Sequence, residues 1–557
     1  MTKSPAATPL PSPVLPSTVS LAAAFSALAP PAPTSTKPLT APTGTEAEHP
    51  TLAKIVATIG PASESPEVVK RLIENGVAVF RFNFSHGDFA AHERRLRTVR
   101  EVASQLNRPI ACLGDLQGPK IRVGKVPEGG IMLNAGQDVL LRRGIPLAFV
   151  DSTDPSNPTP VFPLTYEKLV DEVEPGHKVL INDGAIRMLA VERSADGKDL
   201  RCRVTLGGLV TSNKGINLPQ SKLSAPAITD KDWECVAWAV QHGLDFLALS
   251  FVRGPEEVAQ LKQRLEEICP IDHTMDPKGE GARIPVVAKI EMPQAVKRIN
   301  EIVAIADAIM VARGDLGVEM DIARVPVAQK QILAACHEWG RPCIVATQML
   351  ETMIENASPT RAEASDVANA IFDEADAVML SAETASGKHP ALVVETMRRI
   401  ISVAESRMAE LSRVPSPPPR LVQIHYPTAA LAHGAWHVAQ DIGAKIVACW
   451  SENGGTARYL SQNNFRVPIL AWSSSARSAR RMALLGSVVA VHAAPPASGT
   501  LAEWNEMVDE YVLARGMARP GDAIVLLAGK PLGKAKATNT IAIHVIGESS
   551  TGYRLHR

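Results

Sequence analysis

Eight short apolar segments, each ending in polar or charged residues, constrain this chain's fold more than any other feature. Helical stretches such as residues 66–76, 230–243 and 325–340 lie between most of them. Eight alternating strands and helices predict a (β/α)₈ barrel, a fold whose chemistry gathers at the carboxyl ends of the strands. The predicted strands are residues 54–60, 77–85, 110–117, 246–252, 285–291, 308–317, 342–349 and 377–384.

The third unit of the predicted barrel is interrupted, and a second α/β pattern follows the barrel. The insertion is rich in glycine and β-alternation, and its Asp196-Gly197 pair suits a hairpin, which predicts a small β-domain placed as a lid. A Pro-rich stretch, RVPSPPPR, then precedes strands and helices typical of an open α/β domain. The predicted division is an extension at 1–50, a catalytic barrel at 51–122 and 214–400, a lid at 123–213, a linker at 401–420 and an α/β regulatory domain at 421–557.

Composition excludes several classes of function. Lys+Arg and Asp+Glu both number 58 and aromatic residues make up 4%, which argues against binding to nucleic acid or to membrane surfaces. Residues 1–50 are rich in Pro, Ala, Thr and Ser and predict a disordered extension rather than a signal peptide. No apolar run approaches the roughly 18 residues of a membrane helix. Seven scattered cysteines without a CxxC pair are typical of a reduced, cytoplasmic protein.

Charged and hydroxyl side chains occur at the ends of the predicted strands. In PVVAKIE a buried run ends in Lys289 and Glu291, and residues two apart in a strand share a face. A buried, unpaired charge is costly, so these two must pair, bind a metal or meet a ligand. The same pattern predicts shared strand faces for Arg81, Asn83 and Ser85, for Arg313 and Asp315, and for Ser381 and Glu383, while Asp115 and Thr347 also end strands.

This set of side chains suits a phosphorylated or dicarboxylate-like substrate that chelates a divalent cation. Glu291 and Asp315 come from adjacent strands, and Mg²⁺ commonly takes one or two protein carboxylates. Arg81 offers a planar fork for a phosphate, while Lys289 offers a compact charge. For Arg313 a salt bridge that holds Asp315 or Glu291 is the preferred interpretation. A single strand-end charge is more often a rim salt bridge, and the convergence of several strands at one barrel end is what favours a site.

Nine motifs, in order along the chain, resemble those of the pyruvate kinase family. They are KIVATIGPAS, FRFNFSHG, DLQGPKIR, NKGINLP, VVAKIE, VARGDLGVE, VATQMLETM, PTRAEASDVANAIFD and MLSAETASGKHP. The resemblance is strong over about residues 51–395 and weaker towards the C-terminus. It implies phosphoryl transfer from phosphoenolpyruvate to ADP, giving pyruvate and ATP, in a cytoplasmic glycolytic enzyme that is usually a homotetramer.

The resemblance also implies roles for individual residues. Lys289 would stabilise the transferring phosphoryl group, and Glu291 and Asp315 would hold Mg²⁺ or Mn²⁺. Thr347 and Ser381 fall where the family protonates the enolate. The phosphoenolpyruvate contacts would be Arg81, Lys289, Gly314, Asp315 and Thr347. The nucleotide side would comprise Asn83, Phe84, Ser85, His86, Arg122, Asp183 in the lid, and Lys214.

Two further sites of the family have counterparts here. The monovalent-cation site is similar to Asn83, Ser85, Asp115 and the carbonyl of Leu116, but Lys120 stands where many members have Glu, an exchange that implies independence of K⁺. A Ser/Gly-rich turn at 451–456 resembles the family's allosteric sugar-phosphate site, with residues 529–539 as the facing loop. A bisphosphate, a sugar monophosphate and AMP all stay open as effectors. The turn's residues are Ser451, Glu452, Asn453, Gly454, Gly455 and Thr456.

Two other functions remain as alternatives. The chain could be a catalytically inactive metabolite sensor, against which the intact Lys289, Glu291 and Asp315 argue. It could instead be another Mg²⁺-dependent barrel enzyme acting on phosphoenolpyruvate or pyruvate, such as a lyase. The lid and Lys214 argue against a lyase, because a lyase needs no nucleotide site.

Overall fold

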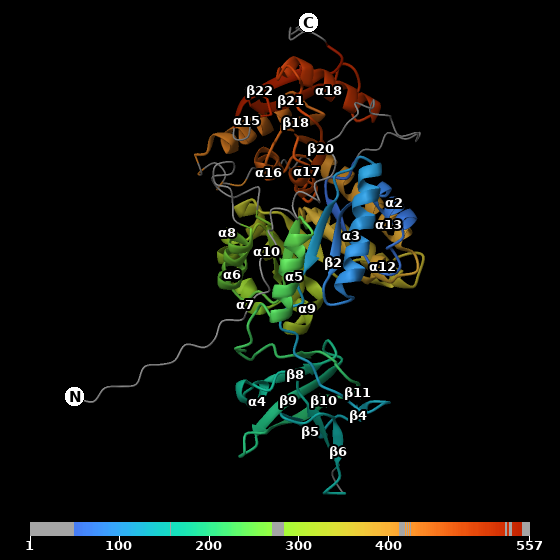
Figure 1. Ribbon diagram of the computed structural model, residues 1–557, viewed down its shortest axis with the longest axis vertical. Helices are drawn as coiled ribbons and strands as arrows, with labels where there is room; N and C mark the ends of the chain where they lie inside the picture. The colour runs from blue at the N-terminus through green and yellow to red at the C-terminus, as the bar shows by residue number, and fades with distance from the viewer. Residues whose placement is uncertain are drawn as a thin grey trace, which may run out of the picture. The chain divides into compact units, whose positions relative to one another are not determined.

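A closed barrel of eight parallel strands forms the centre of the protein, as the sequence predicts (Figure 1). Its strands neighbour one another in the order β1-β17-β16-β15-β14-β13-β3-β2. Almost every strand residue is buried, which is why the strands read as continuous apolar runs. The strands are β1 (Lys54–Thr58), β2 (Val77–Asn83), β3 (Ala111–Asp115), β13 (Phe246–Leu249), β14 (Val286–Ile290), β15 (Ala308–Ala312), β16 (Cys343–Ala346) and β17 (Ala377–Leu380).

The computed structural model describes residues 50–155, 158–269, 283–411, 425–529 and 537–548, together with residues 418, 420, 423, 532 and 533. All of them belong to one unit, Ala47–Arg557. The predicted extension at 1–50 lies outside the described residues except for Pro50, and so does most of the Pro-rich stretch at 413–420. Within the described ranges, no helix is both long and apolar enough to cross a membrane.

Helices follow the barrel strands and begin and end at the residues expected of them. Thr360 and Glu363 form a capping box at the start of α11, and Gly340 ends α10 with a left-handed φ of 60°. The barrel helices are α2 (Pro66–Glu74), α3 (Phe89–Gln105), α5 (Asp230–Gln241), α6 (Pro255–Ile268), α7 (Pro293–Lys297), α8 (Ile299–Ile305), α9 (Arg313–Glu319), α10 (Val325–Trp339), α11 (Arg361–Phe372), α12 (Ala382–Ala385) and α13 (Pro390–Glu410), with 3₁₀ turns at η1 (Ile322–Arg324) and η2 (Glu351–Ile354).

Two of the predicted strand faces are wrong, and that of Arg81, Asn83 and Ser85 is wrong in part, because β2 ends at Asn83 and Ser85 lies in the turn after it. β15 ends at Ala312 and β17 ends at Leu380, and the chain turns into α9 and α12 at once. Arg313 and Asp315 therefore lie on a helix, where residues two apart point roughly 200° away from each other. Ser381 is the N-cap of α12, and its backbone N–H donates to the Glu383 carboxylate at 2.6 Å. An apolar run ending in charges does not show whether a strand continues or a helix begins.

An inserted β-structure separates β3 from β13. A seven-stranded sheet in the order β12-β8-β9-β10-β5-β7-β6 and a two-stranded sheet, β11-β4, surround its own apolar core. The predicted hairpin at Asp196-Gly197 is confirmed, since β9 and β10 pair antiparallel across it and Gly197 has φ 69°. The elements are β4 (Ile131–Leu133), β5 (Asp138–Arg142), β6 (Phe149–Asp151), β7 (Thr159–Pro163), α4 (Leu169–Glu172), β8 (Lys178–Ile181), β9 (Ile186–Arg193), β10 (Asp199–Leu206), β11 (Gly208–Val210) and β12 (Ile216–Asn217).

The C-terminal part is the predicted open α/β structure. A five-stranded sheet in the order β20-β19-β18-β21-β22 carries an apolar cluster on each face. Helix α13 continues to Glu410 through the first half of the predicted linker. The elements are α15 (Pro427–Asp441), β18 (Ile446–Trp450), α16 (Gly455–Ser461), β19 (Ile469–Ser473), α17 (Ala476–Met482), β20 (Val488–His492), α18 (Leu501–Ala514), β21 (Ala523–Gly529) and β22 (Thr538–Val545).

Candidate active site

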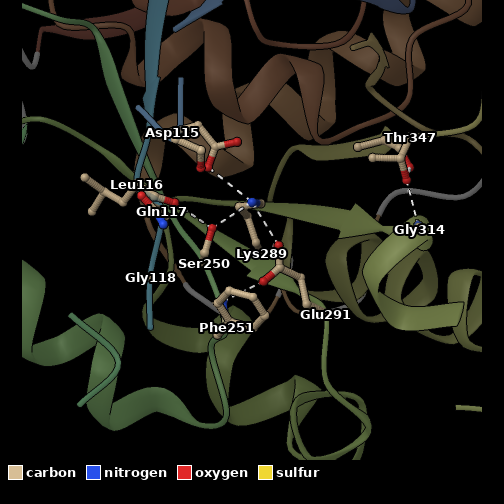
Figure 2. A network of polar contacts seen from close by, with 12 residues as sticks. Asp115, Leu116, Gln117, Gly118, Ser250, Phe251, Lys289, Glu291, Gly314 and Thr347 are labelled. Atoms are coloured by element: carbon tan, nitrogen blue, oxygen red, sulfur yellow. Dashed lines mark hydrogen bonds and ion pairs between the residues drawn. The ribbon is translucent and has the colours of Figure 1, made fainter. Parts of the chain in front are cut away.

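Lys289 stands at the centre of a buried polar network at the carboxyl end of the barrel strands. Figure 2 shows its ammonium joined to Glu291, Asp115 and Ser250, with Nζ at 2.8 Å from Glu291 Oε1, 3.2 Å from Asp115 Oδ1 and 2.7 Å from Ser250 Oγ. The lysine is buried, with the residue only 8% exposed. Burial opposes the ammonium, but Asp115 and Glu291 outweigh it and hold the pKa of Lys289 above its ordinary value. Lys289 is therefore a fixed positive charge.

Asp115 joins this lysine to Arg81. The last residue of β3 is 1% exposed, and its Oδ2 accepts a hydrogen bond from Arg81 Nε at 2.6 Å. Arg81 also donates from Nη1 to Thr58 Oγ1 at 3.0 Å, so its guanidinium is held by two neighbouring strands. Burial alone would raise the pKa of the Asp115 carboxyl. Lys289 and Arg81 outweigh burial and lower that pKa below its ordinary value. Two cations are thus oriented by one buried carboxylate.

Three more carboxylates lie within electrostatic reach of one another beside the lysine. Burial and then the neighbouring Asp315 raise the pKa of Glu291, although Lys289 and the Phe251 N–H, at 2.6 Å, oppose that change. Burial, followed by Asp315 and Glu291, raises the pKa of Glu319 to about 7. Burial is the main cause of both raised pKa values, and repulsion among the three carboxylates adds to it. Carboxylate oxygens gathered in this way fit a hard divalent cation, for which Glu291 and Asp315 are the candidate ligands.

Thr347 and Gly314 form a second, backbone-built part of the site (Figure 2). Thr347 Oγ1 accepts from Gly314 N at 2.7 Å and donates to the Ala346 carbonyl at 2.6 Å. Thr347 has φ 68°, a strained conformation for a β-branched residue. The buried Arg313 holds it there, donating to the Thr347 carbonyl at 2.7 Å and pairing with Asp366 at 2.7 Å. Arg313 is thus a salt-bridged support as predicted, but its partner is Asp366 rather than Asp315 or Glu291.

The predicted nucleotide-side residues occupy two places. Asp183 lines a cavity of about 300 Å³ together with Lys120, Asp315 and Glu319. Arg122 and Lys214 belong to the two chain segments that lead into and out of the insert, and Arg122 Nη1 donates to the Asn213 carbonyl at 2.8 Å. The others follow β2: Ser85 N donates to Asn83 Oδ1 at 3.1 Å, His86 N donates to the Asn83 carbonyl at 3.2 Å, and the Phe84 ring packs edge-on against Trp238.

Comparison with known proteins identifies the family. The model described as pyruvate kinase, barrel domain, matches residues 51–394, and the model described as pyruvate kinase, alpha/beta domain, matches residues 429–544. A pyruvate kinase from Corynebacterium glutamicum is 38% identical over 499 residues, covering 89% of this chain and 98% of the relative. This chain belongs to the pyruvate kinase family. It is accordingly a phosphotransferase enzyme.

Other relatives agree with that assignment. A pyruvate kinase from Mycobacterium tuberculosis is 37% identical over 497 residues, covering 89% of this chain and 98% of the relative. Pyruvate kinase 2 from Synechocystis is 39% identical over 505 residues, covering 89% of this chain and 80% of the relative. The resemblance stated from the motifs is confirmed, and the fold of this family member is the barrel, insert and open sheet described above.

Of the remaining predicted residues, Leu116 joins the lysine network through Ser250 (Figure 2), while Ser381 and the 451–456 turn have no hydrogen bond or ion pair with it within the described ranges. Ser381 Oγ is buried and has no hydrogen-bond partner among the described residues. Leu116 keeps its side chain in the barrel core, while its carbonyl accepts from Ser250 Oγ at 2.7 Å.

In the 451–456 turn, Gly454 has φ 80° and Thr456 Oγ1 lies 2.7 Å from Thr538 Oγ1 of β22. Ser451 Oγ accepts from Ala457 N at 3.2 Å, and Glu452 bonds Ser474 and the indole N–H of Trp450. Part of the facing loop, residues 530–531 and 534–536, is outside the described residues.

Sequence reasoning missed several residues that shape this pyruvate kinase site. Ser250 follows β13, and Phe251, with φ 53°, presents its N–H to Glu291. Both stand at the end of the predicted strand 246–252, so the strand-end rule that found Lys289 had the signal for them. Glu319 lies at the end of α9 and carries no such signal, because the predicted strand 308–317 ends two residues before it.

Proposed function

We propose that this chain catalyses phosphoryl transfer from phosphoenolpyruvate to ADP, giving pyruvate and ATP. The observation that supports this most directly is that the buried Lys289 lies between Asp115 and Glu291. Arg81 pairs with Asp115 as well. Phosphoryl transfer needs little covalent chemistry from the protein and depends on positioning and on charge stabilisation. Lys289 and Arg81 supply fixed, oriented positive charge where a phosphoryl group develops negative charge.

Glu291 and Asp315 are the proposed ligands of Mg²⁺ or Mn²⁺. A divalent cation bound there would orient substrate oxygens and neutralise the charge of the phosphoryl group. The chain's own part is to keep Glu291 in place, through the Phe251 N–H and Lys289 Nζ, and Asp315 on α9. Phosphoenolpyruvate would lie against Arg81, Lys289, Gly314, Asp315 and Thr347, with Thr347 and Ser381 on the side from which the enolate is protonated.

The insert would act as a lid over the nucleotide. Asp183 reaches the same cavity as Asp315, while Arg122 and Lys214 stand at the base of the insert. Asn83, Phe84, Ser85 and His86 would complete the nucleotide side. A closed lid excludes water, which otherwise takes the phosphoryl group from the donor.

Dependence on ADP separates this function from its alternatives. The expected result is pyruvate release from phosphoenolpyruvate only when both ADP and Mg²⁺ are present, with one ATP formed for each pyruvate. Pyruvate or another product released without ADP would favour the lyase. A folded protein that binds a sugar phosphate but turns over nothing would favour the inactive sensor.

Independence of K⁺ is a further prediction, and it rests on Lys120. Lys120 lines the cavity beside Asp183 and Asp315. The family resemblance is what connects this lysine to the monovalent-cation site of Asn83, Ser85, Asp115 and the Leu116 carbonyl, where its fixed charge would replace the bound ion. We expect full activity in K⁺-free tetramethylammonium buffer, and we expect Lys120→Glu to make the activity rise when K⁺ is added. Lys125 is exposed and follows Lys120 closely in the chain, so Lys125→Glu is the matched control. The activity of this variant should not change when K⁺ is added. A wild-type chain that works only with K⁺ would contradict this interpretation.

Regulation and assembly complete the proposal. The proposed site for a phosphorylated effector is the turn Ser451–Glu452–Asn453–Gly454–Gly455–Thr456. The hydroxyl of Thr456 is hydrogen-bonded to that of Thr538 in β22, which holds the turn against the sheet. We further propose that the protein is a cytoplasmic homotetramer, on the basis of the family resemblance. Light scattering of the purified protein measures its molar mass and so checks the tetramer.

A further inference from the structure

Two chain segments connect the insert to the barrel, and they pair with one another. Ile216 N donates to the Ile121 carbonyl and Val123 N donates to the Lys214 carbonyl, both at 2.8 Å. The second segment continues into β12 (Ile216–Asn217), which pairs with β8 of the insert's sheet. Asn217 therefore lies where the insert's sheet meets the barrel. Whatever holds Asn217 also sets the position of that sheet.

Glu319 of the barrel holds Asn217. The Asn217 Nδ2 donates to Glu319 Oε1 at 2.9 Å, and Glu319 is 5% exposed. Glu319 ends α9, one helical turn after Asp315. The turn that carries Asp183 lies against the same helix, because a Cβ placed on Gly184 would stand 3.8 Å from Val318 Cγ1. Helix α9 therefore carries a candidate metal ligand and contacts the insert at two points.

The second oxygen of Glu319 sets this contact apart from an ordinary salt bridge. Oε2 is buried and has no hydrogen-bond partner among the described residues, and Glu319 lines the cavity shared with Asp183 and Asp315. No cation pairs with the carboxylate in the part of the chain that the structure describes. Burying a carboxylate with one oxygen unbonded is costly to the fold. Its one defined partner is the hinge residue Asn217.

We infer that Glu319 is a positioning residue that ties the hinge strand of the insert to the helix carrying Asp315, so that Asp183 and Asp315 face one cavity in a fixed register. The inference rests on the proposed function, since it concerns the alignment of the nucleotide with the phosphoryl donor. Neither Glu319 nor Asn217 needs to touch a substrate for this role. Both act through the geometry of α9 and β12.

A double-mutant cycle tests the tie. Glu319→Ala and Asn217→Ala should each lower kcat/KM for ADP by roughly tenfold to a hundredfold, the scale of loss from a misplacement of about 1 Å. The double variant should be no worse than either single variant, because both remove the same bond. Combining Glu319→Gln with Asn217→Asp exchanges donor and acceptor and should recover much of the activity. Asn75→Ala removes a 2.9 Å amide hydrogen bond between α2 and α13 and is the matched control, expected to leave kcat/KM unchanged.

A readout without substrate separates positioning from general stability. In the ligand-free protein, the rate of hydrogen exchange at the Ile216 amide should rise in both single variants and not in Asn75→Ala. In a separate titration, the affinity for phosphoenolpyruvate should be unchanged in all three variants. Additive losses in the double variant would overturn the inference, as would a raised Mg²⁺ requirement in Glu319→Ala alone, which would make Glu319 a direct ligand. If the wild-type chain formed no ATP, the proposed function would fail, yet the exchange data would still decide the tie.

Discussion

Replacing Lys289 with methionine is expected to lower kcat by about 10²–10³ while phosphoenolpyruvate still binds. One preorganised charge aimed at the transition state typically contributes that much. Arg81 keeps its bond to Asp115, and Glu291 keeps the Phe251 N–H after losing its contact with Lys289, so we expect binding of the ground state to survive. Stopped-flow or steady-state measurement of ATP formation gives the rate, and calorimetric titration with phosphoenolpyruvate gives the affinity.

Lys54→Met is the matched control for that variant. Lys54 is also a buried lysine, 7% exposed, but it lies at the opposite end of its barrel strand. It stands near Glu405 and Asp376, far from any residue of the proposed machinery, and burial lowers its pKa to about 8 despite those two carboxylates. We expect Lys54→Met to keep the wild-type kcat. Turnover of Lys289→Met within a few-fold of wild type would remove Lys289 from the mechanism.

The largest expected effect on stability comes from Asp245, which joins the barrel to the C-terminal α/β structure. Its fully buried carboxylate accepts from Arg100 Nη2 at 2.7 Å, from Cys112 N at 2.9 Å and from Arg480 Nε at 2.9 Å. Asp245→Ala leaves two guanidinium groups without their shared partner. Breaking a buried ion pair from one side typically costs about 3–5 kcal/mol. We expect a clear fall in the urea midpoint, whereas Glu410→Ala, in an exposed pair with Arg407, should change little.

The same residue predicts part of the response to acid. Burial alone would raise the pKa of Asp245, but Arg100 and Arg480 outweigh it and hold the pKa below its ordinary value. A carboxyl whose pKa is depressed in the folded state stabilises the fold above its unfolded pKa of about 3.9. That stabilisation is lost as the pH falls from there through the folded-state pKa. Asp245→Ala should therefore lose less stability than wild type over that acid range, and an equal loss in both would contradict the assignment.

The sequence predicts the barrel well because its strands are buried on both faces and read as unbroken apolar runs. Lys289 and Glu291 could be found because such a run has no reason to end in two charges unless they meet a partner. The faces of Arg313 with Asp315 and of Ser381 with Glu383 could not be found, because a two-residue period does not reveal where a strand gives way to a helix. α9 and α12 begin directly at those strand ends.

Contacts between distant segments set the limit of sequence reasoning. Asn217 and Glu319 are 102 residues apart, and Asp245 and Arg480 are 235 residues apart. Neither pair belongs to a local pattern, and each partner alone reads as an ordinary polar residue near the end of an element. Only the closure of the barrel and the return of the chain onto it bring these residues together.

Following the phosphorus NMR signals of phosphoenolpyruvate and ADP with the wild-type chain and Mg²⁺ tests the central claim most directly. The account predicts that the phosphoenolpyruvate signal decays as the γ-phosphate of ATP grows in equal amount. It also predicts that the exchange slows by about 10²–10³ in Lys289→Met. Loss of phosphoenolpyruvate into inorganic phosphate, or no change at all with a folded protein, would contradict it.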